Sequence, residues 1–200
     1  GDMANTVASG ISEVAARDIN LTQNGCTASD KNDLAKLRWA TGNLKSTGST
    51  NYVWASSTDR GYYYTWYSTY TGNTNINNTD PCSKLNTAYY GTGWRTPSKN
   101  ELTKLARCTN KILTNSGMWF MNNSIGLFLP AAGCRQDGNG SNTSPTTDSG
   151  TDGYYWSSDI GNGNNTGKRL YFGKRYNTAD VADHAKNAGL TVRCVKGTKQ

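Results

Sequence analysis

Several residue types are scarce in this 200-residue chain, and each scarcity excludes a class of protein. The two glutamates stand against twelve aspartates, so helix-forming acidic residues are few and a helix-poor fold is predicted. No apolar run approaches the ~20 residues that a membrane-spanning helix needs. The single histidine, His184, has no Ser or Cys near it in the sequence to form a nucleophile–base pair. We therefore expect a protein that binds, with no enzymatic activity and no cofactor.

The five cysteines form no CxxC pair, which argues against a zinc site; they are Cys26, Cys82, Cys108, Cys134 and Cys194. In a turn-rich chain they predict an exported protein with one or two disulfides and at least one free thiol. Among the possible pairings we expect Cys82–Cys194, because both residues flank predicted scaffold segments and the bridge closes a long loop.

Aromatic residues are plentiful where other apolar residues are sparse: six Trp, twelve Tyr and three Phe accompany an apolar content of 34%. Aromatic burial can supply much of the core of such a chain. Abundant Gly and Asn favour many short strands joined by turns. The net charge of +7 comes from scattered Lys and Arg, which indicates a solvated basic surface and no nucleic-acid partner.

One helix is predicted from Thr96 to Cys108. Ser98-x-x-Glu101 forms a capping box, Pro97 suits the first turn, and apolar residues follow at helical spacing. Strands are expected at residues 33–44, 125–129, 154–158, 168–172 and 190–195, and residues 45–80 are expected to be an aromatic-rich loop region. We see one domain, with residues 1–33 as an extension packed on residues 34–200.

Three further patterns each have two interpretations. The aromatic run Tyr62–Tyr70 can stack on sugars, but covering the edges of the core is favoured. Residues 137–148 place oxygen ligands at alternate positions as calcium loops do, yet Asn142 replaces the expected Gly, so a Gly-rich turn and no metal are favoured. Arg95 and Arg193 lie in predicted scaffold segments and are interpreted as structural.

An ordered set of short motifs resembles the FISUMP family of bacterial surface proteins. The set includes Trp94-Arg95-Thr96-Pro97, Phe128-Leu129-Pro130-Ala131-Ala132-Gly133, Gly153-Tyr154-Tyr155-Trp156-Ser157-Ser158 and Val192-Arg193-Cys194-Val195. The resemblance spans roughly residues 34–196. It implies an α+β, C-type-lectin-like fold related to the formylglycine-generating-enzyme domain, with short twisted antiparallel strands, one or two helices and large loops. Cys134 stands where family members often have an aromatic residue.

Residues 154–196 also resemble the variable region of proteins diversified by retroelements that mutate adenines. Residues 159–166 and 176–185 contain only amino acids that mutation of Asn-type codons can produce. This resemblance implies a polar ligand-binding face made of Asp159, Ile160, Asn162, Asn164, Asn165, Tyr176, Asn177, Asp180, Asp183, His184 and Asn187.

Together these patterns predict a ligand-binding, receptor- or adhesin-type module at the cell surface. The expected ligand is an unknown protein or glycan on another cell or in the environment. We expect the chain to be exported, as an outer-membrane lipoprotein held by a lipid anchor on a removed leader, or to be extracellular. The alternatives are a structural or tip subunit of a surface appendage and a calcium-independent glycan-binding module.

Overall fold

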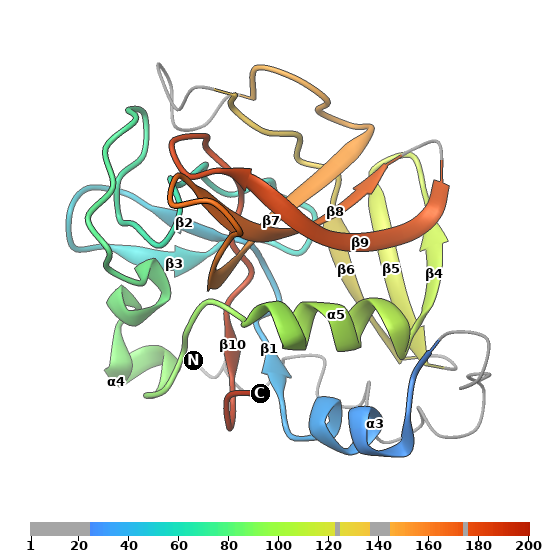
Figure 1. Cartoon of the computed structure of the whole chain (residues 1–200). Helices are drawn as coiled ribbons and strands as arrows, with labels where there is room; N and C mark the ends of the chain where they lie inside the picture. Colours follow the sequence, from blue (N-terminus) through green and yellow to red (C-terminus); the bar gives the residue numbers. More distant parts are fainter. Residues whose placement is uncertain (1–24, 123–124, 137–144, 174–175) are drawn as a thin grey trace.

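Two three-stranded antiparallel sheets and two shorter antiparallel strand pairs form the β-structure of this α+β protein (Figure 1). A computed structural model describes residues 25–122, 125–136, 145–173 and 176–200. The first sheet contains β4 (Asn110–Leu113), β5 (Gly117–Asn122) and β6 (Ile125–Pro130). The second contains β7 (Asp152–Ile160), β8 (Thr166–Gly173) and β9 (Tyr176–Ala185). The short pairs join β1 (Arg38–Trp39) to β10 (Val195–Lys196) and β2 (Leu44–Ser46) to β3 (Tyr52–Trp54).

The predicted helix is present as α5 (Lys99–Arg107), and its capping box is the one expected. The Ser98 hydroxyl accepts the N–H of Glu101 at 3.1 Å, and the Glu101 carboxylate accepts the N–H of Ser98 at 2.8 Å. Pro97 precedes the N-cap and does not occupy the first turn. Leu102, Leu105 and Ala106 are buried on one face, as their spacing predicted.

The strand predicted over residues 33–44 is wrong for its first part, because residues 28–35 form helix α3 (Ala28–Ala35). Thr27 and Asp30 form a capping box that starts this helix, and such a cap outweighs a weak alternation of apolar residues. The predicted domain boundary at residue 33 lies inside α3. The strands of this region are Arg38–Trp39, which pairs with the distant strand β10, and Leu44–Ser46, which pairs with β3 across a hairpin.

The loop region predicted over residues 45–80 contains part of a hairpin, in which Ser46 lies opposite Tyr52 and Leu44 opposite Trp54. It is followed by the 3-10 helix η3 (Pro81–Lys84) and the short helix α4 (Thr87–Tyr90).

Strands β4, β5 and β9 were not predicted, whereas β6, β7 and β8 lie where strands were expected. In β4 only two apolar residues stand side by side, and in β5 four apolar residues follow one another, so neither strand shows the alternation that marks a half-buried strand. The strand expected over residues 190–195 is wrong for most of its length, because only Val195 lies in a strand, β10, and Leu190 and Thr191 form isolated bridges.

Two disulfides connect distant parts of the chain. Cys82 and Cys194 are bonded, as predicted, and Cys26 is bonded to Cys108 at the end of α5. Cys134 is a buried free thiol. The Cys26–Cys108 bridge holds α3 beside α5, where Lys104 Nζ also contacts the Asp33 carboxylate at 2.8 Å.

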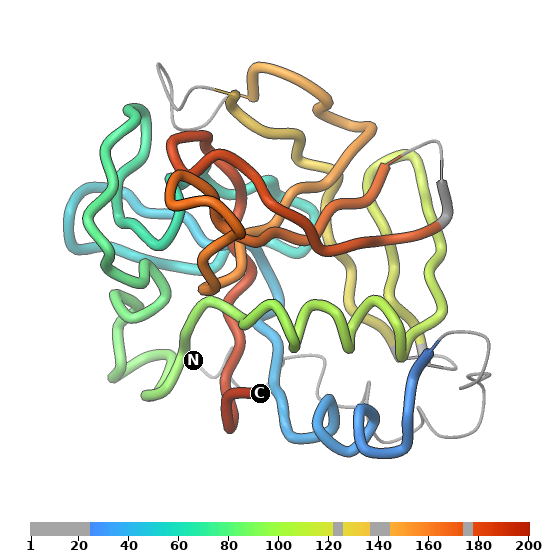
Figure 2. Tube along the Cα trace, viewed as in Figure 1, coloured from blue at the N-terminus to red at the C-terminus, as the bar shows by residue number. Residues whose placement is uncertain are grey.

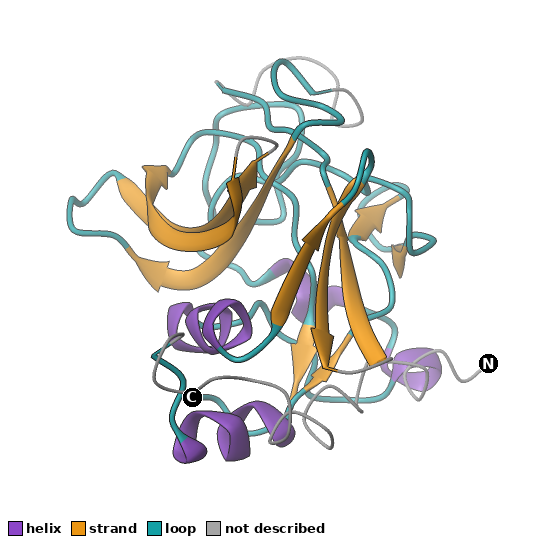
Figure 3. Cartoon of the chain, turned by 90° about the vertical axis from the view of Figure 1, so that its right-hand side faces the viewer, coloured by secondary structure: helices purple, strands orange, loops and turns teal. Residues whose placement is uncertain are grey.

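Two buried clusters form the core; leucine is the commonest residue of the first, whereas aromatic side chains make up much of the second, as the composition predicted for the core. The first lies between α3, α5 and the inner faces of both larger sheets and contains Trp39, Phe120, Tyr155 and Phe172. Figure 3 shows the helices along one end of these sheets. The second lies beside the β2–β3 hairpin and contains Trp54, Tyr64, Trp66, Trp94 and Trp156.

The C-terminal strand returns to the beginning of the described chain. Arg38 lies opposite Lys196 and Trp39 opposite Val195, so β1 and β10 run side by side (Figure 2). Arg95 joins this arrangement, because its backbone pairs with that of Val195 and its guanidinium forms two hydrogen bonds with the Glu101 carboxylate, at 2.6 and 2.7 Å. Arg95 is thus structural, as predicted. No helix in the described part of the chain is long and apolar enough to cross a membrane.

Candidate ligand-binding face

The sheet β7–β8–β9 carries most of the residues predicted to bind ligand. Its inner face packs Tyr155, Leu170, Phe172 and Val181 against the core beneath it. The strands are paired antiparallel, with Tyr154 opposite Tyr171 and Tyr171 opposite Asp180. Because side chains alternate along a strand, the neighbours of the core residues point to the other side of the sheet.

On that other side, five aromatic and charged residues lie near one another, and we call them the outer row: Tyr154, Arg169, Tyr171, Asp180 and His184. Asp180 is exposed, and the other four are partly buried. The Tyr154 ring lies 5.1 Å from the Tyr171 ring and 5.7 Å from the His184 ring, centroid to centroid. The Arg169 guanidinium lies 5.4 Å from the centroid of Tyr171. Its Nη1 is 3.8 Å from a carboxylate oxygen of Asp180, whose side chain is 71% exposed.

The ionisable groups of the outer row are strongly influenced by their surroundings. Burial, with the nearby Arg169 charge, lowers the pKa of His184 to about 4, so the ring is neutral at pH 7. Burial and a hydrogen bond to the Asp152 carboxylate raise the pKa of Tyr171 to about 12. Burial and a 2.6 Å hydrogen bond to Asp148 likewise raise the pKa of Tyr154. At neutral pH the row therefore presents neutral rings beside one cation and one carboxylate.

His184 is less exposed than predicted. It was expected to be a surface residue, but the structure places it half-buried, edge-on to the rings of Tyr154 and Trp156. Its position on β9 explains the difference, because alternation turns it toward the aromatic cluster that contains Trp156.

The turns at one end of the sheet form a second exposed group, which we call the turn rim: Ile160, Asn162, Asn164, Asn165 and Asn187. These side chains are all exposed, and that of Ile160 is 52% exposed. The two turns touch, because the Asn165 carbonyl accepts the N–H of Lys186 at 2.9 Å. The structure thus brings these five predicted residues together.

Asp159 and Asp183 were predicted to contact ligand, and both have contacts within the scaffold. Asp159 accepts the N–H of Lys99, the first residue of α5, at 2.6 Å. Asp183 accepts the N–H of Asn162 at 2.9 Å and lies 2.6 Å from Lys168 Nζ, contacts that lower the pKa of its carboxyl group. Asp183 and His184 are adjacent in β9 and point to opposite sides of the sheet.

Two other predicted residues, Tyr176 and Asn177, begin β9. Their side chains lie outside the described part of the structure.

Three members of the outer row, Tyr154, Arg169 and Tyr171, were not predicted to bind ligand, because they belong to strands that were interpreted only as scaffold. Their alternation with the buried residues Tyr155, Leu170 and Phe172 is the signal that identifies them.

The aromatic run Tyr62–Tyr70 mainly covers the core, as the favoured interpretation held. Tyr63, Tyr64 and Trp66 are buried, and the Trp66 indole donates to the carbonyl of Ser157 at 3.0 Å. This leaves the partly exposed Tyr62 and Tyr67 and the exposed Tyr70 for contact with a ligand.

The described residues contain one compact group of metal-ligating atoms, from Cys26, Asp30 and Cys108. The two sulfurs are bonded to each other, so neither is a thiolate that could bind a metal. The segment weighed as a calcium loop, residues 137–148, lies mostly outside the described residues.

Comparisons with known proteins match residues 113–195 to a family described as "Domain of unknown function (DUF8237)". The match runs from the last residue of β4 to the first residue of β10 and therefore includes β5 to β9 and the outer row. No curated protein and no solved structure matches the chain.

Proposed function

We propose that this protein is a surface-displayed, ligand-binding module of the receptor or adhesin type. Its scaffold is C-type-lectin-like, and its ligand face combines the outer row with the turn rim. Binding involves no chemical step. The ligand is a protein or glycan of another cell or of the environment, and the chain is exported and held at the surface.

The observation that carries the proposal is that the residues that stabilise the sheet are separate from the exposed residues of the turn rim. Backbone pairing joins β9 to β8, and inner-face residues such as Leu170 and Phe172 bury the sheet. The turn rim is exposed and packs against neither core cluster. Such a rim can change in sequence at little cost in stability.

The chemistry of the face suits an adaptable binding surface. Asparagine side chains both donate and accept hydrogen bonds, and the tyrosines of the outer row offer large, rigid contact area. The pairing of Tyr154 with Asp148 and of Tyr171 with Asp152 holds these rings in place before a ligand arrives. Preorganisation of this kind lowers the entropic cost of binding.

A pair of libraries tests the proposal. One library randomises Asn162, Asn164, Asn165 and Asn187; the other randomises four buried residues, Leu102, Phe120, Leu170 and Phe172. We expect most members of the first library to resist proteolysis like the parent chain and few of the second to do so. If the two libraries lose folded members equally, the rim is part of the folding core and the proposal fails.

Binding itself is measured with immobilised parent protein and a variant that carries alanine at the same four rim positions. We expect the parent to capture a defined component from intact-cell surface extracts and the variant to lose it, with an unchanged Tm. Equal capture by both proteins would place the binding surface elsewhere.

We also propose that residues 159–187 are diversified in nature by a retroelement. Sequencing of the neighbouring DNA tests this: a template repeat that differs from the gene only at adenines within these codons is expected. Differences spread evenly over all four bases would contradict it.

A further inference from the structure

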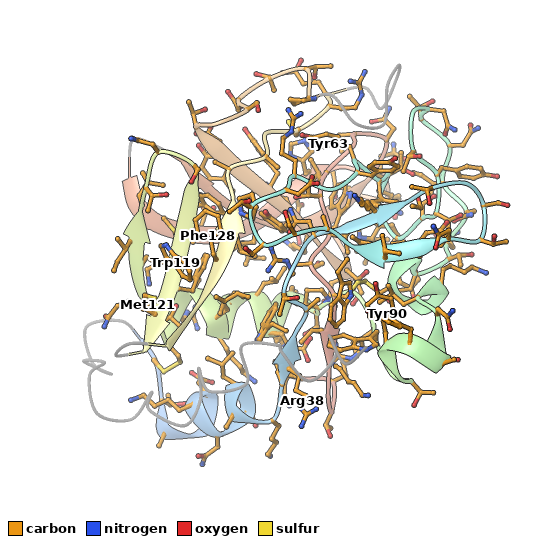
Figure 4. The ribbon with its side chains drawn as sticks, turned by 180° about the vertical axis from the view of Figure 1, so that it is seen from behind. Arg38, Tyr63, Tyr90, Trp119, Met121 and Phe128 are labelled. Atoms are coloured by element: carbon orange, nitrogen blue, oxygen red, sulfur yellow. A yellow bond between two sulfur atoms is a disulfide. The ribbon has the colours of Figure 1, made fainter. Side chains whose placement is uncertain are left out.

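A pocket lies on the other three-stranded sheet, away from the outer row. It is bordered by Trp119 and residues 126–128 of β5 and β6, by Thr41 and Ser57 from the N-terminal half, and by Arg193. Figure 4 shows Trp119 and Phe128 next to each other on this side of the molecule. The pocket brings together three parts of the chain that are far apart in sequence.

One wall of the pocket is aromatic. Trp119 is 38% exposed, and its ring centroid lies 5.0 Å from that of Phe128. Across the sheet, Trp119 lies opposite both Phe128 and Ile112, which is 51% exposed. An exposed indole beside apolar neighbours offers a flat surface on which the face of another ring can stack.

The positively charged part of the pocket lining comes from Arg193, which is 2% exposed. Its Nε donates to Asn43 Oδ1 at 2.9 Å and its Nη1 donates to the Ala40 carbonyl at 3.1 Å. Its Nη2 is buried and has no hydrogen-bond partner. Burial lowers the pKa of Arg193 to about 10, so the guanidinium is still charged at pH 7.

No carboxylate of the described residues forms an ion pair with Arg193. A buried cation without a counter-charge, and a buried donor without an acceptor, both lower stability. An anion that reached the Arg193 guanidinium from the pocket would relieve both deficits, whereas a neutral or cationic group would relieve at most one.

We propose that this pocket is a binding site for a carboxylate carried on a ring-sized body, with the ring against Trp119 and the carboxylate directed to Arg193. The hydroxyl groups of Thr41 and Ser57 supply further hydrogen bonds. The volume of about 190 Å³ is below the ~300–1,000 Å³ of sites for larger ligands, which limits the occupant to about one ring. Acidic sugars and aromatic acids share this chemistry.

The pocket contains no residue of the outer row or the turn rim. The proposed function and this inference can therefore fail separately.

The experiment uses two acids and two neutral analogues of similar shape. Glucuronate and benzoate are titrated into the protein and compared with glucose and benzamide, by NMR shifts of the Trp119 indole and by calorimetry. A one-ring acid should bind with a Kd on the order of 1 mM. It should bind roughly tenfold or more tightly than its neutral analogue, because a charge-assisted hydrogen bond is lost in the analogue. Binding of glucuronate alone identifies a sugar acid, and binding of benzoate alone an aromatic acid.

Substitutions at the edge of the pocket avoid the structural role of Arg193. Ser57→Glu places a carboxylate at the exposed Ser57 position and should weaken acid binding about tenfold, whereas its uncharged match Ser57→Gln should change it far less. Trp119→Ala should weaken binding about fivefold through lost stacking. Ile112→Ala, which lies outside the pocket, should leave acid binding unchanged. The proposal is overturned if neither acid shifts Trp119, if neutral analogues bind equally well, or if Ser57→Glu and Ser57→Gln behave alike.

Discussion

The carboxylate of Asp159 accepts the backbone N–H of Lys99 at 2.6 Å, across 60 residues of sequence. This hydrogen bond connects the end of β7 to the first residue of α5. The side chain that the sequence placed in a variable binding face thus stabilises the N-terminus of a helix. A negative charge at that end also interacts favourably with the helix dipole.

Replacing Asp159 should therefore lower stability. We expect Asp159→Ala to reduce the free energy of unfolding by about 1 kcal/mol, the usual loss for a helix-capping acceptor. Asp159→Asn should lose less, because an acceptor remains. Urea denaturation measures both, with Asn164→Ala, an exposed rim substitution, as the control. Equal stability of Asp159→Ala and Asn164→Ala would show that the capping bond contributes nothing.

Glu101 should be far more sensitive than an exposed charge. Its carboxylate is fully buried and accepts hydrogen bonds from Arg95 and from the backbone of Ser98 and Gln200. Glu101→Gln leaves the Arg95 charge without its partner, and we expect a loss of about 3 kcal/mol in the free energy of unfolding. Lys45→Gln breaks an exposed contact of 4.0 Å and should change it by less than ~0.5 kcal/mol. Similar losses for the two variants would contradict this assignment.

The cysteines should differ sharply in reactivity. Peptide mapping under non-reducing conditions should find Cys26 joined to Cys108 and Cys82 joined to Cys194. Cys134 is buried, and burial raises the pKa of its thiol to about 12, so the reactive thiolate is almost absent at pH 8. A thiol reagent should label no residue in the native protein and Cys134 alone in 6 M guanidinium chloride. Rapid labelling of the folded protein would refute the buried position of Cys134.

His184 gives a direct measurement, since it is the single histidine of the chain. NMR titration should find its pKa near 4, below the ~6.5 of an unperturbed histidine. Between these two values the unfolded chain binds more protons than the folded protein at this residue. The contribution of His184 to the free energy of unfolding is therefore fully present above pH ~6.5 and decreases as the pH falls toward 4. The variant His184→Gln should lack this part of the pH dependence; a titration midpoint near 6.5 would mean that the ring is solvated.

Helix α5 and strands β6, β7 and β8 were predictable because their signals are local. The Ser98–Glu101 capping box and the alternation around Leu170 each depend on residues that lie only a few positions apart in the sequence. Strand β9 was not predicted, since its residues are mostly small or polar and its order comes from pairing with β8. Propensity alone does not reveal an edge strand that is held by its neighbour.

The sequence by itself determined the helix with its cap and the large aromatic share of the core, and it correctly predicted the structural role of Arg95 and the Cys82–Cys194 bridge. Only the tertiary structure decided which polar residues are free to bind. Asp159 and Asn164 are both short polar residues in the same part of the sequence. Asp159 accepts a hydrogen bond from the first residue of α5, whereas Asn164 is exposed. The tertiary structure also placed Arg193 and Trp119 in the lining of one pocket. These two residues are 74 positions apart in the sequence, and the packing of separate segments brings them together. Contacts of this kind depend on how elements pack, and no local pattern of residues encodes them.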